Sequence, residues 1–270
     1  MKALVTGSTD GIGFATAEKL AAKGYFVLLH GRNEKRCDEA AEKIKSKNPG
    51  AMLDFIAADL SELKKVEAAS EIILKKHPDL NILINNAGVF FSDREITEDG
   101  FESTFQINYL SHVLLTLNLT NALIKQGRGR IINVSSMAHA WAKLDFENLN
   151  GEKHYSGEEA YAVSKLCNIM FTYKLSRVIA GSGVTVNALH PGVINTKLLR
   201  KGWGIGGAPV SAGSETSVYL AASEEVENIT GKYFVDKKPA ASSKISYDKE
   251  LQEELWNLTL KMLNVKKFPF

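Results

Sequence analysis

Residues 3–13 read Ala-Leu-Val-Thr-Gly-Ser-Thr-Asp-Gly-Ile-Gly, and they join a short apolar run to a helix-length stretch. Gly7 permits a tight turn, Gly11 leaves room for a pyrophosphate to approach the backbone, and Gly13 lets the following helix pack closely on the strand. The free N–H groups of a helix N-terminus attract phosphate oxygens. The segment therefore predicts a phosphate site, with an ordinary tight turn as the alternative, because G-x-x-x-G-x-G is not the G-x-G-x-x-G spacing.

The rest of the chain alternates short apolar runs with helix-length amphipathic stretches. Strands are expected at residues 3–6, 26–29, 52–57, 81–84, 130–134, 184–188 and 232–235, and helices at 12–23, 34–47, 62–76, 100–125 and 158–180. Runs of Val, Ile and Leu between helices are typical of parallel strands buried on both faces. The pattern predicts an α/β fold, a doubly wound, Rossmann-like parallel sheet of about seven strands with helices on both faces.

Two segments interrupt this alternation. Residues 137–157 show no strong periodicity, and residues 197–213 hold five glycines around Trp203 and Pro209. Long irregular connections in compact domains are usually functional or mobile, so both are expected to shape a ligand pocket, the second as a mobile lid. No linker rich in Pro, Gly or Ser divides the chain, and residues 1–270 are expected to form one domain.

Composition and charge exclude several classes of protein. Hydrophobic residues make up 44% of the 270 residues and charged residues 24%, which does not fit a disordered or fibrous chain. A net charge of +2 gives no electrostatic footprint for nucleic acid. Cys37 and Cys167, far apart in the sequence, favour reduced thiols in a cytoplasmic protein. No signal peptide and no transmembrane segment are expected.

Tyr161 and Lys165 are four residues apart on a predicted helix that begins after the capping box Ser156-Gly-Glu-Glu159. This spacing puts both side chains on one helix face. An ammonium group about 4 Å away favours the phenolate, so we expect the pKa of Tyr161 to fall by roughly one to two from its ordinary value near 10. Taken alone, the pair also fits a surface contact on an amphipathic helix.

Several motifs occur together and in order: residues 6–13, Asn85-Asn-Ala-Gly88, Ser135-Ser136, Tyr161-x-x-x-Lys165 and Pro191-Gly192. Over essentially the whole chain this set resembles the short-chain dehydrogenase/reductase family. Four further stretches are similar to its retinol dehydrogenase-like branch: residues 136–139, 150–155, 231–234 and 254–257. One departure from the commonest family pattern is the distance between Ser136 and Tyr161, which are separated by 24 residues. That branch carries a similar extension, which bears on substrate shape.

The resemblance implies a catalytic set of four residues. Tyr161 passes a proton to or from the substrate oxygen, and Lys165 lowers the pKa of Tyr161 and holds the nicotinamide ribose. Ser136 hydrogen-bonds the carbonyl or alcohol oxygen and is preferred to Ser135 because the family motif places the catalytic hydroxyl second. Asn108 holds a water near Lys165 that completes a proton relay.

The resemblance also implies where the cofactor and the substrate bind. Asn86 supports the strand next to the cofactor, Asp59 accepts from the adenine amino group, and the loop after residue 190 lies beside the nicotinamide. The full cofactor set is Gly7, Ser8, Thr9, Asp10, Gly11, Ile12, Gly13, Arg32, Asp59, Leu60, Asn86, Ala87, Gly88, Tyr161, Lys165, Pro191, Gly192, Val193 and Thr196, and the substrate set is Ser136, Tyr161 and Trp203.

The end of the second expected strand predicts which nicotinamide cofactor is used. An NAD enzyme of this architecture usually places an acid there, to accept from the ribose 2′-hydroxyl. Gly31 stands in that place and Arg32, whose guanidinium suits a 2′-phosphate, follows it. NADP(H) is therefore expected over NAD(H). Arg32→Ala is expected to weaken NADPH binding, and replacing Gly31 with Asp as well is expected to shift the preference toward NADH.

These observations together predict an NADP(H)-dependent oxidoreductase that interconverts a carbonyl and an alcohol. Apolar residues in or near the two long connections, among them Trp141 and Trp203, favour a lipophilic small-molecule substrate. The alternative is a non-catalytic NAD(P)-binding regulator. A hydrolase is disfavoured because there is no G-x-S-x-G, and no metal site is expected because the six histidines are scattered. The family resemblance further implies a homodimer or homotetramer built on helices 100–125 and 158–180.

Overall fold

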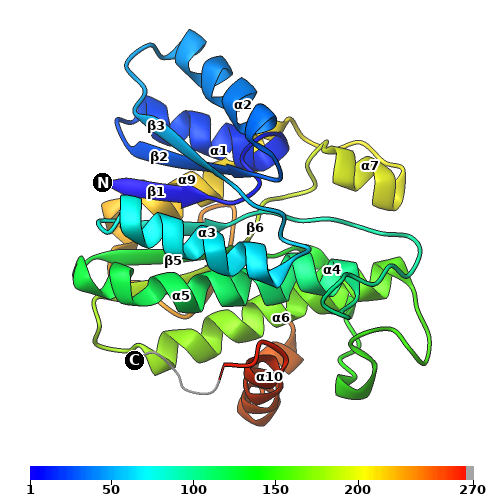
Figure 1. Cartoon of the computed structure of the whole chain (residues 1–270). Coiled ribbons are helices and arrows are strands. Elements are labelled where there is room, and N and C mark those ends of the chain that lie inside the picture. The colour runs from blue at the N-terminus through cyan, green and yellow to red at the C-terminus, as the bar shows by residue number, and fades with distance from the viewer. Residues whose placement is uncertain (266–270) are drawn as a thin grey trace.

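One sheet of eight strands crosses the molecule in the computed structural model, which describes residues 1–265 (Figure 1). The strand order is β3-β2-β1-β4-β5-β6-β7-β8, and every neighbouring pair is parallel except β7 and β8. The strands are β1 Lys2–Val5, β2 Phe26–Gly31, β3 Leu53–Ala57, β4 Ile82–Asn85, β5 Gly129–Val134, β6 Val184–His190, β7 Lys232–Val235 and β8 Lys238–Ala240. The predicted doubly wound, Rossmann-like sheet is confirmed.

Strand β8 was not among the expected strands. It pairs antiparallel with β7 through a two-residue turn in which Asp236 and Lys237 have φ of +47° and +63°. Such a turn normally carries Asn-Gly or Asp-Gly, and this one lacks the glycine that would have revealed it. Pro239 also reads against a strand, and it is tolerated here because β8 is at the edge of the sheet.

Helices cover both faces of the sheet (Figure 1). On one face lie α3 (Leu63–Lys76), α5 (Ser111–Lys125) and α6 (Gly157–Val178), with α10 (Lys249–Met262) packed against α6; on the other lie α1 (Gly11–Ala22), α2 (Glu34–Lys47) and α9 (Glu215–Ala222). Each face has its own apolar core, the first around Leu115 and Leu166 and the second around Ala17 and Val218. Both α9 and α10 are additions to the expected helices.

The expected helix over residues 100–125 is not a regular α-helix throughout. It consists of α4 (Ser103–Phe105), a π-helical turn η1 (Gln106–Leu110) and α5. Buried Glu102 begins it, because its carboxylate accepts hydrogen bonds from the backbone N–H groups of Thr104 and Phe105 at 2.9 and 2.7 Å. A π-turn shifts the side chains that follow it and occurs often at functional sites, and this one contains Asn108.

The two long connections contain short helices. Residues 137–157 hold η2 (Met137–Trp141) and η3 (Phe146–Asn148), and residues 197–213 hold α7 (Lys197–Trp203) and α8 (Val210–Gly213). The expectation that residues 197–213 are irregular is therefore wrong for most of that segment. Thr196 caps α7, and Gly204 ends it at φ +65°, where glycine is favoured. Two more 3₁₀ turns are η4 (Glu224–Val226) and η5 (Lys244–Tyr247).

The sheet order reverses between β1 and β4, which both continue into loops at their carboxyl ends. In open α/β sheets ligands bind at such a switch point. Within residues 1–265, no helix has both the length and the apolar character needed to cross a membrane.

Candidate active site

A cavity of about 850 Å³ opens at the switch point. Of the residues expected from the sequence to bind cofactor or substrate, it is lined by Gly7, Thr9, Asp10, Gly11, Ile12, Gly13, Arg32, Asp59, Leu60, Asn86, Ala87, Gly88, Ser136, Tyr161, Lys165, Pro191, Gly192, Val193, Thr196 and Trp203. Ser8 does not line it, because its hydroxyl accepts from the backbone N–H of His30 at 2.8 Å, beneath the turn. Residues spread over the sequence from 7 to 203 thus share one site.

The glycine turn leaves room that side chains would fill. Gly7 has φ +64°. A Cβ on Gly13 would lie 2.3 Å from the carbonyl oxygen of Gly7 and 2.4 Å from Nδ2 of Asn86, too close for any other residue. Asp10 caps α1, its Oδ1 accepting from the N–H of Gly11 at 2.8 Å. The turn and the α1 N-terminus therefore fit the pyrophosphate of a dinucleotide.

Thr6 and Asn86 fix the loops after β1 and β4 against each other. The Nδ2 of Asn86 donates to the carbonyl of Thr6 at 2.8 Å, and the Thr6 hydroxyl accepts from the N–H groups of Asn86 and Ala87 at 2.8 and 2.9 Å. These contacts agree with the expectation that Asn86 supports the strand that it follows. Together they hold the two sides of the crevice at a fixed distance.

Arg32, which follows β2, lines the cavity, and so does Arg36 of α2, which was not predicted from the sequence. A second basic residue four positions after Arg32, in the first turn of α2, was the available signal. Gly31 is packed tightly: a Cβ there would lie 2.5 Å from Cγ2 of Thr9 and 3.0 Å from Sγ of Cys37. Replacing Gly31 with Asp therefore meets a steric obstacle that the sequence did not indicate.

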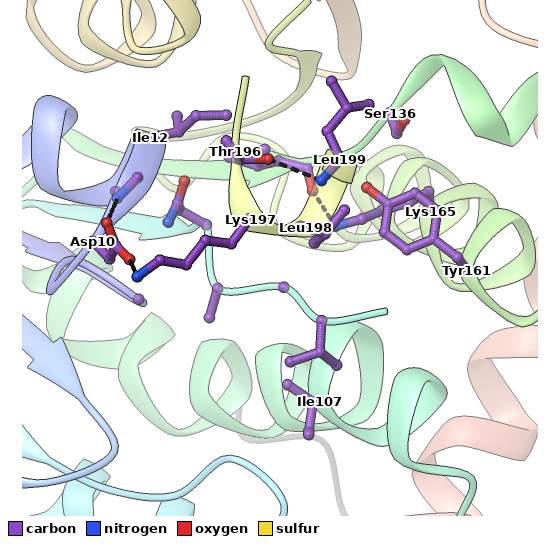
Figure 2. Close-up of a pocket in the computed structure, with 18 of the residues that line it drawn as sticks. Asp10, Ile12, Ile107, Ser136, Tyr161, Lys165, Thr196, Lys197, Leu198 and Leu199 are labelled. Carbon is purple, nitrogen blue, oxygen red and sulfur yellow. Dashed lines mark hydrogen bonds and ion pairs between the residues drawn. The ribbon is translucent and has the colours of Figure 1, made fainter. Parts of the chain in front are cut away.

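Tyr161 and Lys165 project from α6 into the cavity that Ser136 also lines (Figure 2). Ser156 caps α6 as expected, since its side chain accepts from the N–H of Glu159. The Nζ of Lys165 donates to the carbonyl of Val134 at 3.0 Å and lies 5.5 Å from the ring centroid of Tyr161. All three side chains line the cavity at the ends of β5 and α6.

The pKa values of this pair do not follow the sequence-based prediction. Burial raises the pKa of Tyr161 to about 12, although the Ser136 hydroxyl offsets part of the effect. Burial lowers the pKa of Lys165 to about 8. The expected depression of the Tyr161 pKa is therefore wrong for the protein alone, because burial raises it. At neutral pH the phenol is protonated and able to donate.

The two neighbouring serines differ in their surroundings. Ser135 is buried and its hydroxyl donates to the carbonyl of Lys165 at 2.7 Å. Both serines line the cavity, but the hydroxyl of Ser136 accepts from the N–H of Ala138 at 3.2 Å and interacts with Tyr161. The geometry thus favours Ser136 over Ser135 as the group that meets a ligand.

Asn108 lies behind the cavity wall, which it does not line. Its Oδ1 accepts from the N–H of Val89 at 2.8 Å, and its Nδ2 donates to the carbonyl of Val89 at 3.0 Å. A Cβ added to Gly88 would lie 3.7 Å from Asn108 Oδ1 and 3.6 Å from Lys165 Nζ, so the two polar groups flank the same glycine. The side chain of Asn108 therefore fixes the loop that passes in front of Lys165.

An apolar wall closes the cavity beside Tyr161. The ring of Trp203 lies 5.3 Å from the ring of Tyr161 and 5.3 Å from that of Phe90, centroid to centroid. Leu198 of α7 packs on the same cluster. Met137, Trp141 and Ile205 also line the cavity and remain exposed. Trp203 is thus brought to the place expected for substrate.

The histidines do not form a metal site among the described residues, where no group of three or more His, Cys, Asp or Glu side chains is placed to hold an ion. His139 instead bonds the carbonyl of Ser136 at 2.6 Å and accepts from the N–H of Ser243 at 3.1 Å. Since a main-chain N–H donates to its Nε2, the ring is neutral with its proton on Nδ1. His139 therefore fixes the backbone of Ser136.

Comparison with known proteins gives concordant matches. The profile of the short chain dehydrogenase family matches residues 1–203. Human polyprenol dehydrogenase is 37% identical to 97% of this chain, over 85% of its own length. Mouse retinol dehydrogenase 13 is 38% identical to 97% of this chain, over 83% of its own length.

Solved structures share the fold. A putative uncharacterized protein from Mycobacterium paratuberculosis superposes on 100% of this chain and 95% of its own, with a TM-score of 0.83 and 29% identity. A putative NAD(P)-dependent gluconate 5-dehydrogenase from Beutenbergia cavernae, with bound NADP, covers 86% of this chain and 93% of its own, with a TM-score of 0.71 and 27% identity.

Proposed function

Because this chain belongs to the short-chain dehydrogenase family, within its retinol dehydrogenase-like branch, we propose that it uses NADP(H) to interconvert a lipophilic carbonyl compound and its alcohol. Its relatives are named dehydrogenases, and the chain is an NAD(P)-dependent alcohol dehydrogenase or carbonyl reductase. The observation that carries the finer proposal is the convergence of Ser136, Tyr161 and Lys165 beside an apolar wall in the cavity that contains the glycine turn.

The three residues divide the acid–base work. When bound, the nicotinamide supplies or accepts the hydride. In the direction of reduction Tyr161 donates its proton to the substrate oxygen, and its high pKa in the protein keeps that proton available. The Ser136 hydroxyl hydrogen-bonds the same oxygen as negative charge develops there.

Lys165 and Asn108 support Tyr161 in different ways. The pKa of Lys165, about 8, leaves mostly an ammonium at neutral pH, whose charge favours the phenolate that remains after proton transfer. In the proposed function Lys165 has a second role, which is to hold the ribose of the cofactor. We also propose the predicted role of Asn108 in a proton relay, because Asn108 lies across Gly88 from Lys165.

The lipophilic substrate rests on the composition of the wall beside Tyr161. Leu198 and Trp203 form it and pack on buried Phe90, and the exposed rim carries Met137 and Trp141. Two relatives are named for polyprenol and retinol, which are both lipophilic alcohols. The bound-NADP neighbour is named for gluconate, a polar substrate, so polar sugars belong in any substrate panel as the competing class.

The choice of NADP(H) rests on Arg32 and Arg36 at the cavity and on the absence of an acid at Gly31. A charge-assisted hydrogen bond is worth about 1.5–3 kcal/mol, so Arg32→Ala is expected to weaken NADPH binding about ten- to a hundred-fold and to leave NADH within about twofold. Calorimetric titration of both cofactors measures this. A wild-type protein that prefers NADH would show that neither arginine meets a 2′-phosphate.

A sterically fitted exchange provides the converse test. Since Cγ2 of Thr9 is the nearest atom to a side chain at Gly31, Gly31→Asp is combined with Thr9→Ser, which removes that methyl group and leaves Cys37 Sγ at 3.0 Å, and Thr9→Ser alone is the control. The combined variant is expected to lose at least about tenfold in NADPH affinity by repulsion of the 2′-phosphate, and the control less than about twofold.

The cellular location and the oligomeric state of the protein remain proposals. Cys37 and Cys167 are both buried free thiols, which supports a cytoplasmic protein. The expected homodimer or homotetramer remains a prediction, to be checked by light scattering. Trp256 of α10 stacks on Phe171 of α6 with centroids 5.9 Å apart, so part of the α6 surface expected to join subunits is covered by the chain itself.

A further inference from the structure

The peptide group between Ser136 and Met137 is held by a histidine at each end. Its carbonyl oxygen lies 2.6 Å from Nδ1 of His139, and its N–H donates to Nδ1 of His190 at 3.2 Å. His139 lies in η2, just after β5, whereas His190 ends the neighbouring strand β6. Two segments that meet at the cavity thus each provide one ring to the same peptide group.

The two rings carry their protons on different nitrogens. Nε2 of His139 accepts from the N–H of Ser243 at 3.1 Å, so the proton is on Nδ1 and is donated to the carbonyl of Ser136. Nδ1 of His190 accepts from the N–H of Met137, so its proton is on Nε2. Both rings are neutral in this arrangement, and each can hold the peptide group in only one of its two tautomers.

The surroundings of both rings favour the neutral form. Burial lowers the pKa of His139, whose ring meets the ring of Tyr233 edge-on with 5.0 Å between centroids. Burial and the neighbouring His139 lower the pKa of His190 to about 4, and the nearby carboxylate of Asp236 offsets only part of this shift. Neither ring is therefore protonated at neutral pH, and both hydrogen bonds to the peptide group are retained.

The peptide group held by the histidines determines the direction of the Ser136 side chain. On one side of Ser136, the N–H of Ser135 donates to the carbonyl of Leu189 at 2.7 Å and keeps the chain on β6. On the other side, the plane of the peptide group sets ψ of Ser136 at 158°. With both sides fixed, the Cα–Cβ bond of Ser136 has one direction, and the side chain lines the cavity together with Tyr161.

We propose that His139 and His190 are positioning residues that hold the Ser136 hydroxyl at the substrate oxygen, and that the N–H of Ser243 belongs to the same support because it selects the tautomer of His139. The proposal rests on the proposed function, in which Ser136 hydrogen-bonds that oxygen. Ser243 immediately precedes η5, well beyond residue 203, where the match to the family profile ends. The C-terminal segment therefore contributes to the geometry of the active site through a residue that does not line the cavity.

Amide side chains at position 139 separate the roles of the two ring nitrogens. Asn places its amide where Nδ1 lies and can still donate to the carbonyl of Ser136, whereas Gln places its amide where Nε2 lies and can bond only Ser243. His139→Gln is expected to lower kcat about five- to twentyfold and to leave NADPH affinity within about twofold, because the hydrogen bond at the reacting oxygen is weakened. His139→Asn is expected to keep kcat within about threefold.

The same pair of substitutions at His190 is expected to give the same order of kcat values. Oδ1 of Asn can accept from the N–H of Met137 where Nδ1 does, and the longer Gln side chain places its amide elsewhere. A role of the rings in packing alone would make the two amides equivalent. Equal losses of kcat for Asn and Gln at either position therefore contradict the proposal for that histidine.

A double-mutant cycle shows whether His139 acts through Ser136. Ser136→Ala removes the hydroxyl and is expected to lower kcat about 10²–10³-fold. In that background His139→Gln is expected to change kcat by less than about twofold, because there is no hydroxyl left to position. An undiminished effect of His139→Gln in the Ser136→Ala background overturns the proposal.

The tautomers are measured independently of activity, by long-range ¹H–¹⁵N correlation spectra of the isotope-labelled protein at pH 7. His139→Asn and His190→Asn assign the signals. We expect the proton on Nδ1 of His139 and on Nε2 of His190, and the opposite tautomer or a charged ring at either position overturns the proposal. A wild-type protein that shows these tautomers and turns over no carbonyl compound would instead contradict the proposed function, while the hydrogen bonds to the peptide group would stand.

Discussion

A Tyr161→Phe variant is expected to bind NADPH as tightly as the wild type while kcat falls by at least about 10²–10⁴-fold. The substitution removes one oxygen atom and keeps the ring that packs on Phe90 and Trp203. Proton donation to the substrate oxygen is lost, and so is a hydrogen bond to that oxygen, which adds to the effect. Steady-state rates and calorimetric NADPH affinity, measured on the same preparations, separate chemistry from binding.

Tyr173→Phe is the matched control for this variant. Tyr173 lies on the same helix, and its hydroxyl bonds the hydroxyl of Ser242 at 2.7 Å, away from the cavity. Its kcat is expected to remain within about threefold of the wild type, since no group at the reacting atoms changes. Near-normal turnover in Tyr161→Phe would remove Tyr161 from the proton transfer.

Lys165→Met is expected to damage activity and stabilise the fold. The ammonium is buried, and a pKa of about 8 in place of 10.5 means that keeping it charged costs about 3 kcal/mol at neutral pH. Loss of its hydrogen bond to the carbonyl of Val134 offsets about 1 kcal/mol of this gain in stability. The free energy of unfolding at pH 7 should therefore rise by about 2 kcal/mol, while NADPH affinity and turnover both fall at least about tenfold.

The pH dependence of that stability follows from the lowered pKa of Lys165. The unfolded chain binds a proton at Lys165 up to about pH 10.5, whereas the folded protein releases it near pH 8. Wild-type stability therefore rises relative to Lys165→Met between pH 8 and 10.5, and the advantage of the variant disappears there. Urea unfolding at pH 7 and pH 10 measures it. An equal difference at both pH values would show that Lys165 is not held at a cost in the folded state.

Most of the sheet could be predicted from the sequence because its parallel strands are largely buried and their sequences are rich in Val, Ile and Leu. Strand β8 could not, since it is a three-residue edge strand that contains Pro239 and follows a turn without glycine. The irregular reading of 197–213 failed for a related reason. Glycines dominate that stretch, but only Gly204 ends a helix with positive φ, while Gly202 lies inside α7.

The members of the cavity were predictable because their motifs follow strand ends, and parallel strands bring those ends to one edge of the sheet. The protonation states of Tyr161 and Lys165 could not be predicted in the same way. A separation of four residues shows that Tyr161 and Lys165 share a helix face, but it does not show that both are buried, and burial decides both pKa values. Lys197, which lines the cavity and pairs with Asp10, was not predicted, because that pair depends on tertiary structure.

The most direct test of the whole account is NADPH oxidation by the wild-type protein with a panel of aromatic and aliphatic aldehydes and ketones, with polar sugars as the competing class. We predict formation of the alcohol product, a higher kcat/KM for the lipophilic carbonyl compounds than for the sugars, and at least about a tenfold preference for NADPH over NADH, as loss of one charged contact implies. Calorimetric binding of NADPH without turnover of any member of the panel, in either direction of the reaction, would contradict the account and indicate a non-catalytic NAD(P)-binding regulator.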